Sequence, residues 1–144
     1  MPRSPERVVR EWFQQVWNEG REDAIDRLMA ADAPVHGLSG PHGGTIRGAK
    51  AFKPFFRMFQ RAMGDMEIEV VRTVVEGDLC ATHCHVIARH TGGGLGSDAT
   101  GRTVDFWGMA IARVQDGRIV ESWNCFDFLS MYQQLGWVKN PPQP

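Results

Sequence analysis

The chain has 144 residues, with 16 Lys and Arg against 17 Asp and Glu and a formal net charge of −1. That length favours a single domain over residues 1–144, and a hydrophobic fraction of 42% is typical of a globular protein. The near-neutral charge argues against nucleic acid as a partner, and three cysteines, an odd count, argue against a disulfide scaffold. The sequence shows no signal-peptide pattern and no apolar run of membrane length, so we expect a cytoplasmic protein with no membrane partner.

The first twenty residues predict a helix with one apolar side. Ser4 is a good N-cap, and Pro5 at the first helical position has no amide hydrogen to leave unpaired. Gly20 ends the segment. Between them, apolar side chains recur at spacings of four and five residues: Val8, Val9, Trp12, Phe13, Val16 and Trp17.

Two further helices are expected before the chain changes its pattern. One spans about residues 22–30 and precedes a short strand at residues 34–36. Residues 37–48 hold five glycines and a proline, which indicates a loop. The third helix spans about residues 49–63 and carries a broad aromatic stripe: Phe52, Phe55, Phe56 and Phe59.

From residue 66 onward, segments rich in Val and Ile predict strands, with a Gly-rich excursion at residues 91–102 and a last short helix at about 128–135. The four expected strands span residues 66–76, 79–90, 103–114 and 118–126. Helices gathered first and strands gathered last indicate an α+β fold. We expect a curved antiparallel sheet wrapped around three N-terminal helices, forming a cone with an internal pocket. The core is expected over about residues 5–137, with a frayed, Pro-rich tail at 138–144.

Side chains alternate between the two faces of a strand, and this alternation places the candidate chemistry. In the 79–90 strand, we assign the smaller and less polar face to the helix side, which puts His90 at its inner end and His83 and His85 outside. This inner set comprises Cys80, Thr82, Cys84, Val86, Ala88 and His90. In the last strand, we expect the face shared by Trp123, Cys125 and Asp127 to be the inner one.

Asp127 supports two hypotheses, and the sequence leaves both open. Its carboxylate can be the N-cap of the last helix. It can also be a general acid/base in an apolar pocket, because buried carboxylates are costly and are frequent at functional sites.

The remaining candidates carry weaker signals. His36 could point inward from the short strand, and His42 is ambiguous. His83 and His85 have the spacing of a metal pair, but no third ligand is evident, so we predict no metal site. Seven aromatic side chains are candidates for binding a substrate: Trp12, Trp17, Phe52, Phe56, Phe59, Phe106 and Trp123.

A series of short motifs extends over about residues 5–137. In chain order it includes Trp17-Asn18-Glu19-Gly20, His36, Glu76-Gly77-Asp78, His90-Thr91-Gly92, Thr100-Gly101-Arg102, the run from Asp116 to Glu121, Trp123 with Asp127, and Gln134-Leu135-Gly136. Each motif alone is weak, but their order and spacing together resemble the SnoaL-like polyketide cyclase (ester cyclase) family. That family belongs to the larger group with the nuclear-transport-factor-type cone fold.

The resemblance implies a six-stranded curved sheet, three covering helices and a homodimer formed through the sheet, with no cofactor and no metal. It also implies a site, because polyketide cyclases of this family use an aspartate at the end of the last strand as acid/base in an intramolecular aldol closure. Asp127 matches that aspartate through its spacing from Trp123. Those cyclases also use a histidine on the preceding strand, which this chain lacks, so His90 or His36 would have to replace it.

The leading hypothesis is therefore a cofactor-free enzyme of polyketide cyclase, isomerase or lyase type that acts on a hydrophobic carbonyl compound. Its catalytic candidates are Asp127, His90 and His36. One alternative is a non-catalytic dimeric domain that binds a hydrophobic small molecule. Another is an epoxide-hydrolase-like activity, for which Asp105 and Arg113 are the available pair.

Overall fold

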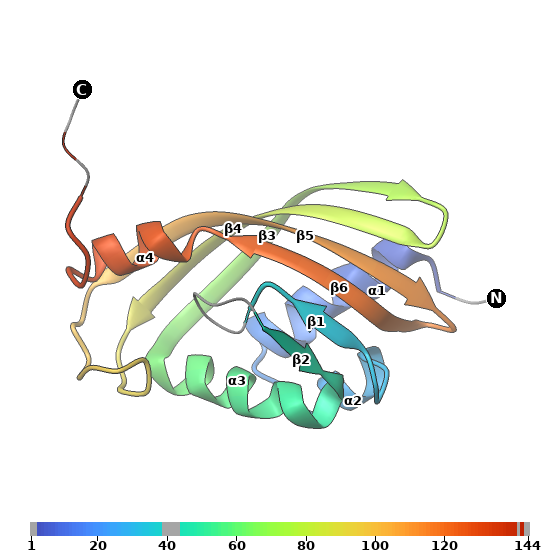
Figure 1. The fold of residues 1–144 in the computed structure, drawn as a ribbon, viewed down its shortest axis with the longest axis horizontal. Helices are drawn as coiled ribbons and strands as arrows, with labels where there is room; N and C mark the ends of the chain where they lie inside the picture. Colours follow the sequence, from blue (N-terminus) through green and yellow to red (C-terminus); the bar gives the residue numbers. More distant parts are fainter. Residues whose placement is uncertain (1–2, 39–43, 141, 143–144) are drawn as a thin grey trace.

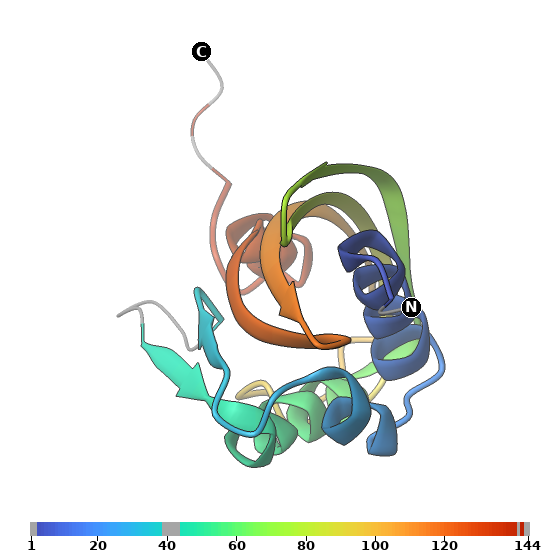
Figure 2. The ribbon, with the colours of Figure 1, turned by 90° about the vertical axis from the view of Figure 1, so that its right-hand side faces the viewer.

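Six strands form one curved, open sheet, and helices cover its concave face (Figure 1). The computed structural model describes residues 3–38, 44–140 and 142, so His42 lies outside the described residues. Seen along its length, the sheet curls around the N-terminal helix (Figure 2). This arrangement confirms the predicted α+β cone. No helix within the described ranges is long and apolar enough to cross a membrane.

The N-terminal helix changes its winding part-way along. Helix α1 (Pro5–Glu11) is capped by Ser4 as predicted and continues directly as a π-helix, η1 (Trp12–Asn18). A π-helix forms hydrogen bonds between residues five apart, and such segments are frequent at functional sites. Trp12 and Trp17, five residues apart, therefore lie on one face and are both buried against the sheet.

Two further helices and one at the end of the chain complete the cover. Helix α2 spans Asp23–Leu28, α3 spans Gly48–Ala62 and α4 spans Phe128–Gln134. The strand bounds are β1 Pro34–His36, β2 Thr45–Arg47, β3 Met63–Glu76, β4 Leu79–His90, β5 Thr103–Gln115 and β6 Arg118–Phe126. The strands lie in the order β2-β1-β6-β5-β4-β3.

The sheet differs in two respects from the prediction made from residue patterns. Strand β2 lies within the segment predicted to be a loop, where it pairs with β1. Its three residues are too few for an alternating pattern, and glycines surround them. The sheet is also not wholly antiparallel, because β1 runs parallel to β6.

Strand β4 faces the helices as predicted. Side chains at its alternate positions are all buried: Cys80, Thr82, Cys84, Val86, Ala88 and His90. The intervening residues, which include His83 and His85, face outward. The alternation in β4 between smaller, less polar residues and larger, more polar residues therefore predicted correctly which side chains face the helices.

The β5–β6 hairpin contains a bulge that reverses the prediction for β6. Near the turn Val114 pairs with Ile119, but the next pair is Arg113 with Glu121, so Val120 is an extra residue. One extra residue exchanges the two faces of a strand from that point onward. The assignment of Trp123, Cys125 and Asp127 to the inner face is wrong: all three are exposed. The inner residues are Ser122, Asn124 and Phe126.

A side-chain amide holds the π-helix to the edge of the sheet. Strand β3 is an edge strand, and its Ile68 backbone N–H donates to Asn18 Oδ1 at 2.6 Å. Asn18 Nδ2 in turn donates to the Ile68 carbonyl oxygen at 2.9 Å. Asn18 thus satisfies both polar groups of one edge residue and fixes η1, with its two tryptophans, against the sheet.

Replacing Asn18 by Ala should lower the free energy of unfolding by about 1–3 kcal/mol, because two partly buried backbone groups lose their partner. Urea unfolding followed by circular dichroism measures this difference. Gln14→Ala is the matched control on the same helix, since Gln14 is exposed and removing it takes away only the exposed hydrogen bond from Asn18 Nδ2 to Gln14 Oε1, not the two bonds to Ile68. Equal losses in the two variants would contradict the role given to Asn18.

Candidate functional site

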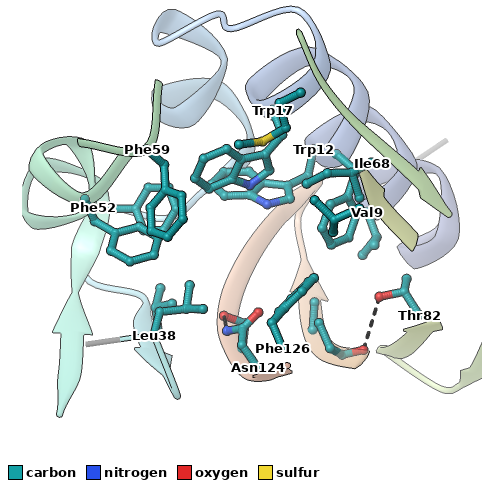
Figure 3. Close-up of a pocket in the computed structure, with 18 of the residues that line it drawn as sticks. Val9, Trp12, Trp17, Leu38, Phe52, Phe59, Ile68, Thr82, Asn124 and Phe126 are labelled. Carbon is teal, nitrogen blue, oxygen red and sulfur yellow. Dashed lines mark hydrogen bonds between the residues drawn. The ribbon is translucent and has the colours of Figure 1, made fainter. Parts of the chain in front are cut away.

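A cavity of about 90 Å³ lies between the helices and the concave face of the sheet (Figure 3). Its helical wall is aromatic, and the residues come from η1 and α3: Trp12, Phe13, Trp17, Phe52, Phe55 and Phe59. The Trp17 ring lies 5.6–6.3 Å from four phenylalanine rings of α3. Aromatic rings in tilted and edge contacts give a rigid, well-packed wall.

The sheet wall opposite is lined by small side chains. They include Cys80, Thr82, Ala88, Ala110, Ala112 and Ser122. Close packing normally fills a protein interior, so small residues on one wall and rigid rings on the other leave a space between them. Larger side chains such as Phe106 and Phe126 also line the sheet wall. The Phe126 ring lies across Gly108, where a Cβ would be 2.1 Å from ring carbon Cδ1.

Helix α4 contributes one ring, Phe128, to the cavity lining. Phe128 lies 5.9 Å from Phe59, 6.1 Å from Phe106 and 6.2 Å from Phe126, measured between ring centroids. Phe128 therefore joins α4 to α3, β5 and β6. A volume of about 90 Å³ is well below the ~300–1,000 Å³ of pockets for drug-sized ligands. The cavity can hold one small ring, or the end of a longer chain.

The polar groups of the cavity are few, and none is charged. Asn124 Nδ2 donates to the His36 carbonyl oxygen at 3.0 Å and to Ser122 Oγ at 3.2 Å. Thr82 Oγ1 donates to the Ala110 carbonyl oxygen at 3.3 Å. Among the described residues, no Asp, Glu, His, Lys or Arg lines the cavity.

The predicted substrate-binding residues divide into two groups. Five of them line the cavity: Trp12, Trp17, Phe52, Phe59 and Phe106. Phe56 does not, because it packs behind Trp17 at a ring distance of 5.6 Å. Trp123 was predicted on the inner face and lies instead on the outer face, stacked 5.8 Å from His36.

Asp127 does not lie in the cavity. The residue is exposed, and its Oδ1 accepts from the Ser130 backbone N–H at 3.0 Å. That contact is the N-cap of α4, which is the simpler of the two hypotheses the sequence left open. Since its carboxylate is solvated, the argument from burial in an apolar interior does not apply to it.

The two candidate histidines also lie outside the cavity lining. His90 is fully buried, and its Nδ1 accepts from the Thr100 backbone N–H at 3.0 Å, which closes the loop between β4 and β5. His36 is half-buried at the other side of the sheet, where its Nε2 lies 2.9 Å from Glu121 Oε2. Both histidines therefore contact structural partners, and the structure does not bring either together with Asp127.

The outer face collects the other polar candidates. His85 stacks on Trp107 at 4.4 Å and its Nε2 lies 2.5 Å from Asp105 Oδ1. Arg113 pairs with Asp78 at 2.7 Å. Asp105 and Arg113, the pair considered for epoxide hydrolysis, thus face away from the cavity. In the described part of the chain, no three His, Cys, Asp or Glu side chains are grouped as metal ligands would be.

Several lining residues were missed from the sequence, and the β5–β6 pairing is the signal that could have found the two polar ones. Ser122 and Asn124 lie opposite Ala112 and Ala110. A regular hairpin closed at Asp116-Gly117 would place them outside, so only the bulge reveals their direction. Leu38 and Phe128 were missed because they lie at or beyond the end of an element, where the pattern carries little information. Phe55 belongs to the aromatic stripe predicted for the third helix but was not selected as a binding residue, and Met131 lies within the short helix α4.

The cone fold and this cavity can be compared with known proteins. A sequence model described as SnoaL-like polyketide cyclase matches residues 7–135. The chain belongs to this family. The curated protein "Aklanonic acid methyl ester cyclase DauD" of Streptomyces sp. (strain C5) is 25% identical over 143 residues, covering 90% of this chain and 86% of that protein.

Several solved structures have a similar fold. IdmH of Streptomyces antibioticus, described as a candidate polyketide cyclase, is 29% identical with a TM-score of 0.79, covering 93% of this chain and 99% of IdmH. A SnoaL-like protein of Jannaschia sp. CCS1 has a TM-score of 0.81 at 20% identity, covering 96% and 93% of the two chains. An epoxide hydrolase of M. tuberculosis has a TM-score of 0.70 at 22% identity, covering 91% and 88%. The last two likenesses concern the fold alone.

The three thiols differ in their surroundings. Cys80 and Cys84 are fully buried on the inner face of β4, and Cys125 is exposed on the outer face of β6. Burial raises the pKa of the Cys80 thiol and raises the pKa of Cys84 to about 11. Because thiolates are the reactive form, the two buried thiols should be inert and Cys80 should act in the cavity as a small apolar group.

In native protein at pH 8, a disulfide reagent should therefore react with Cys125 alone, at a rate that depends on whether the outer face is covered, and Cys125→Ser should remove that reaction. The other two thiols should react after unfolding in urea. The raised pKa of Cys84 also stabilises the fold below pH 9.0, and this contribution should fall as the pH rises toward 11. A second fast-reacting thiol in native Cys125→Ser would contradict this assignment.

Proposed function

We infer that the protein binds a hydrophobic carbonyl compound in the cavity and promotes an intramolecular ring closure by holding the compound in a folded conformation. The observation that carries this proposal is the lining, which is apolar, largely aromatic and free of charged side chains over the described residues. Membership of the cyclase family supports the class of reaction, and the relative DauD is named for the cyclisation of a methyl ester.

Shape can supply much of the catalysis in such a site. Holding two reacting groups of one molecule in the correct geometry can lower a barrier by ~7–11 kcal/mol in favourable cases. The rigid ring wall of η1 and α3 provides a surface against which a flexible chain would fold. No cofactor is needed for a closure of this kind.

Acid/base chemistry of isomerase or lyase type by Asp127 is the second candidate. One observation favours it: the neighbours of Asp127 in the chain, Phe126 and Phe128, both line the cavity. The carboxylate would have to release the Ser130 N–H and turn past these two rings. Binding without turnover is the third candidate, and detection of a product separates it from the first two.

Asp127→Asn distinguishes shape from acid/base catalysis, because Asn caps a helix about as well as Asp. We expect this variant to keep its turnover, and Asp127→Ala to lose about 1 kcal/mol of stability through loss of the cap. Ala110→Phe should abolish turnover by filling the cavity, at a cost in stability of ~1–3 kcal/mol. The assay follows isomers of unchanged mass by chromatography, with short linear ketones of a size that the cavity can hold as substrates.

Loss of turnover in a folded Asp127→Asn protein would overturn the shape proposal in favour of acid/base chemistry. Unfolding curves for each variant show whether the fold is kept. Retained turnover in Ala110→Phe would show that the reaction takes place elsewhere.

We also propose that two copies associate through the outer face of the sheet. Large apolar side chains lie on adjacent strands at its centre: Ile87, Trp107, Met109, Ile111 and Trp123, all exposed by 37–59%. Contiguous exposed apolar patches mark interaction sites. Association through the outer face would leave the cavity on the concave side free.

Sedimentation should give a mass twice that of the 16.2 kDa chain, and Met109→Glu should return it to the monomer, since an unpaired charge in an apolar interface is costly. Val75→Glu is the control, because Val75 is 45% exposed at the β3–β4 hairpin, on the face opposite the patch. A monomeric native protein, or equal effects of both variants, would contradict the proposed dimer.

A further inference from the structure

The polar end of the cavity is a pair of side chains on the inner face of β6. Ser122 and Asn124 are two residues apart and contact one another through Asn124 Nδ2 and Ser122 Oγ. Figure 3 shows the Asn124 amide at the floor of the cavity, between Leu38 and Phe126. The hydrogen bonds of these two residues decide which of their polar atoms remain free to bind a ligand.

The orientation of the Asn124 amide is fixed by its partners. The His36 carbonyl oxygen can only accept a hydrogen bond, so the atom that lies 3.0 Å from it must be the amide nitrogen. The second amide hydrogen is directed to Ser122 Oγ. Both donors are therefore used. Asn124 Oδ1 is left as an acceptor without a donor among the described residues.

The two neighbouring hydroxyl groups differ in what they leave free. Ser122 Oγ accepts from Asn124, and its own hydrogen has no acceptor in the part of the chain that the structure describes. The Thr82 hydroxyl hydrogen is already donated to the Ala110 carbonyl oxygen. At this end of the cavity, Asn124 Oδ1 is thus a free acceptor beside a free donor, the Ser122 hydroxyl. The indole N–H groups of Trp12 and Trp17 on the opposite wall are further donors without an acceptor among the described residues.

We propose that this pair recognises an uncharged head group with a hydroxyl next to a carbonyl, as in an enolised 1,3-dicarbonyl compound. The hydroxyl donates to Asn124 Oδ1, and the carbonyl oxygen accepts from Ser122. The proposal rests on the proposed function and names its substrate class. A polar site of this kind discriminates strongly, because a ligand without the matching group leaves buried atoms unpaired.

The same geometry selects against carboxylates. A carboxylate has no hydrogen to donate to Asn124 Oδ1, and two acceptors would then face each other. No cation lies among the described lining residues to offset the charge, and burial of an unpaired charge is costly. Ligand discrimination therefore depends on the hydroxyl hydrogen rather than on the overall polarity of the head group.

Three single-ring probes that suit the small cavity test the assignment. Benzoylacetone carries the enolised dicarbonyl, butyrophenone keeps the ring and one carbonyl but lacks the hydroxyl, and benzoate carries a charge. Calorimetric titration at neutral pH should show benzoylacetone binding about tenfold more tightly than butyrophenone. A tenfold difference in affinity corresponds to the contribution of one hydrogen bond. Benzoate should show no binding.

Asn124→Leu should reduce the ratio of the two ketone affinities to near one, because it removes the acceptor of the hydroxyl hydrogen. Ser122→Ala should weaken the binding of both ketones by a similar factor, because both carry the carbonyl that accepts from Ser122. Asn124→Leu also removes the contact with β1, so Ser122→Ala, which leaves the His36 backbone untouched, tests the pair through this shared loss of affinity if the first variant does not fold. Cys125→Ser, on the same strand but the outer face, is the matched control and should keep the native ratio. Thermal unfolding of each variant shows whether the fold is intact.

The outcomes separate this inference from the proposed function. Equal affinity of native protein for the two ketones, or native affinities for both ketones in Ser122→Ala, would overturn the role of the pair and leave the apolar cavity as a ligand site. Absence of binding by either ketone would overturn the proposed function itself. Tight binding of benzoate would contradict the uncharged head group.

Discussion

One extra residue in the last strand, Val120, decides which side chains face the cavity. The hairpin between β5 and β6 closes in a regular register, with Val114 opposite Ile119, and the bulge then shifts it by one. Without that shift, Trp123 and Cys125 would project toward the cavity. With it, Ser122 and Asn124 project inward. The polar end of the cavity and the outward position of Trp123 both follow from this one irregularity.

The bulge also limits what the sequence could show. In β4, inner and outer residues follow from alternation alone, because a core-facing series of small residues lies between histidines and an arginine that face outward. In β6 the same reasoning fails, since alternation counted from the Asp116-Gly117 turn gives the wrong face. No glycine or proline marks Val120 as the extra residue. The fold was therefore predictable from helix and strand periods, whereas the polar part of the site was not.

The aromatic wall was easier to predict, and the reason is physical. Trp12 and Trp17 lie five residues apart, which an α-helix would place partly around its circumference but a π-helix places on one face. Phe52 and Phe59 are seven apart on α3, two full turns of an α-helix. Large rings at such spacings have to be buried, whatever the details of the sheet. What these rings face depends on the sheet. Small residues on its concave side, such as Ala110, leave the space that forms the cavity.

His36, a catalytic candidate from the sequence, contacts its neighbours on both sides of the sheet. Its ring is held between Thr45 and Glu121 at 2.9 Å each and stacks on Trp123, all on the far side of the sheet from the cavity. Its carbonyl oxygen reaches the inner side and accepts from Asn124. The imidazole contacts fix β1 against β6, and β1 in turn fixes the amide. His36 is thus a positioning residue for the polar end of the cavity: its backbone orients the amide while its side chain anchors the strand that carries it.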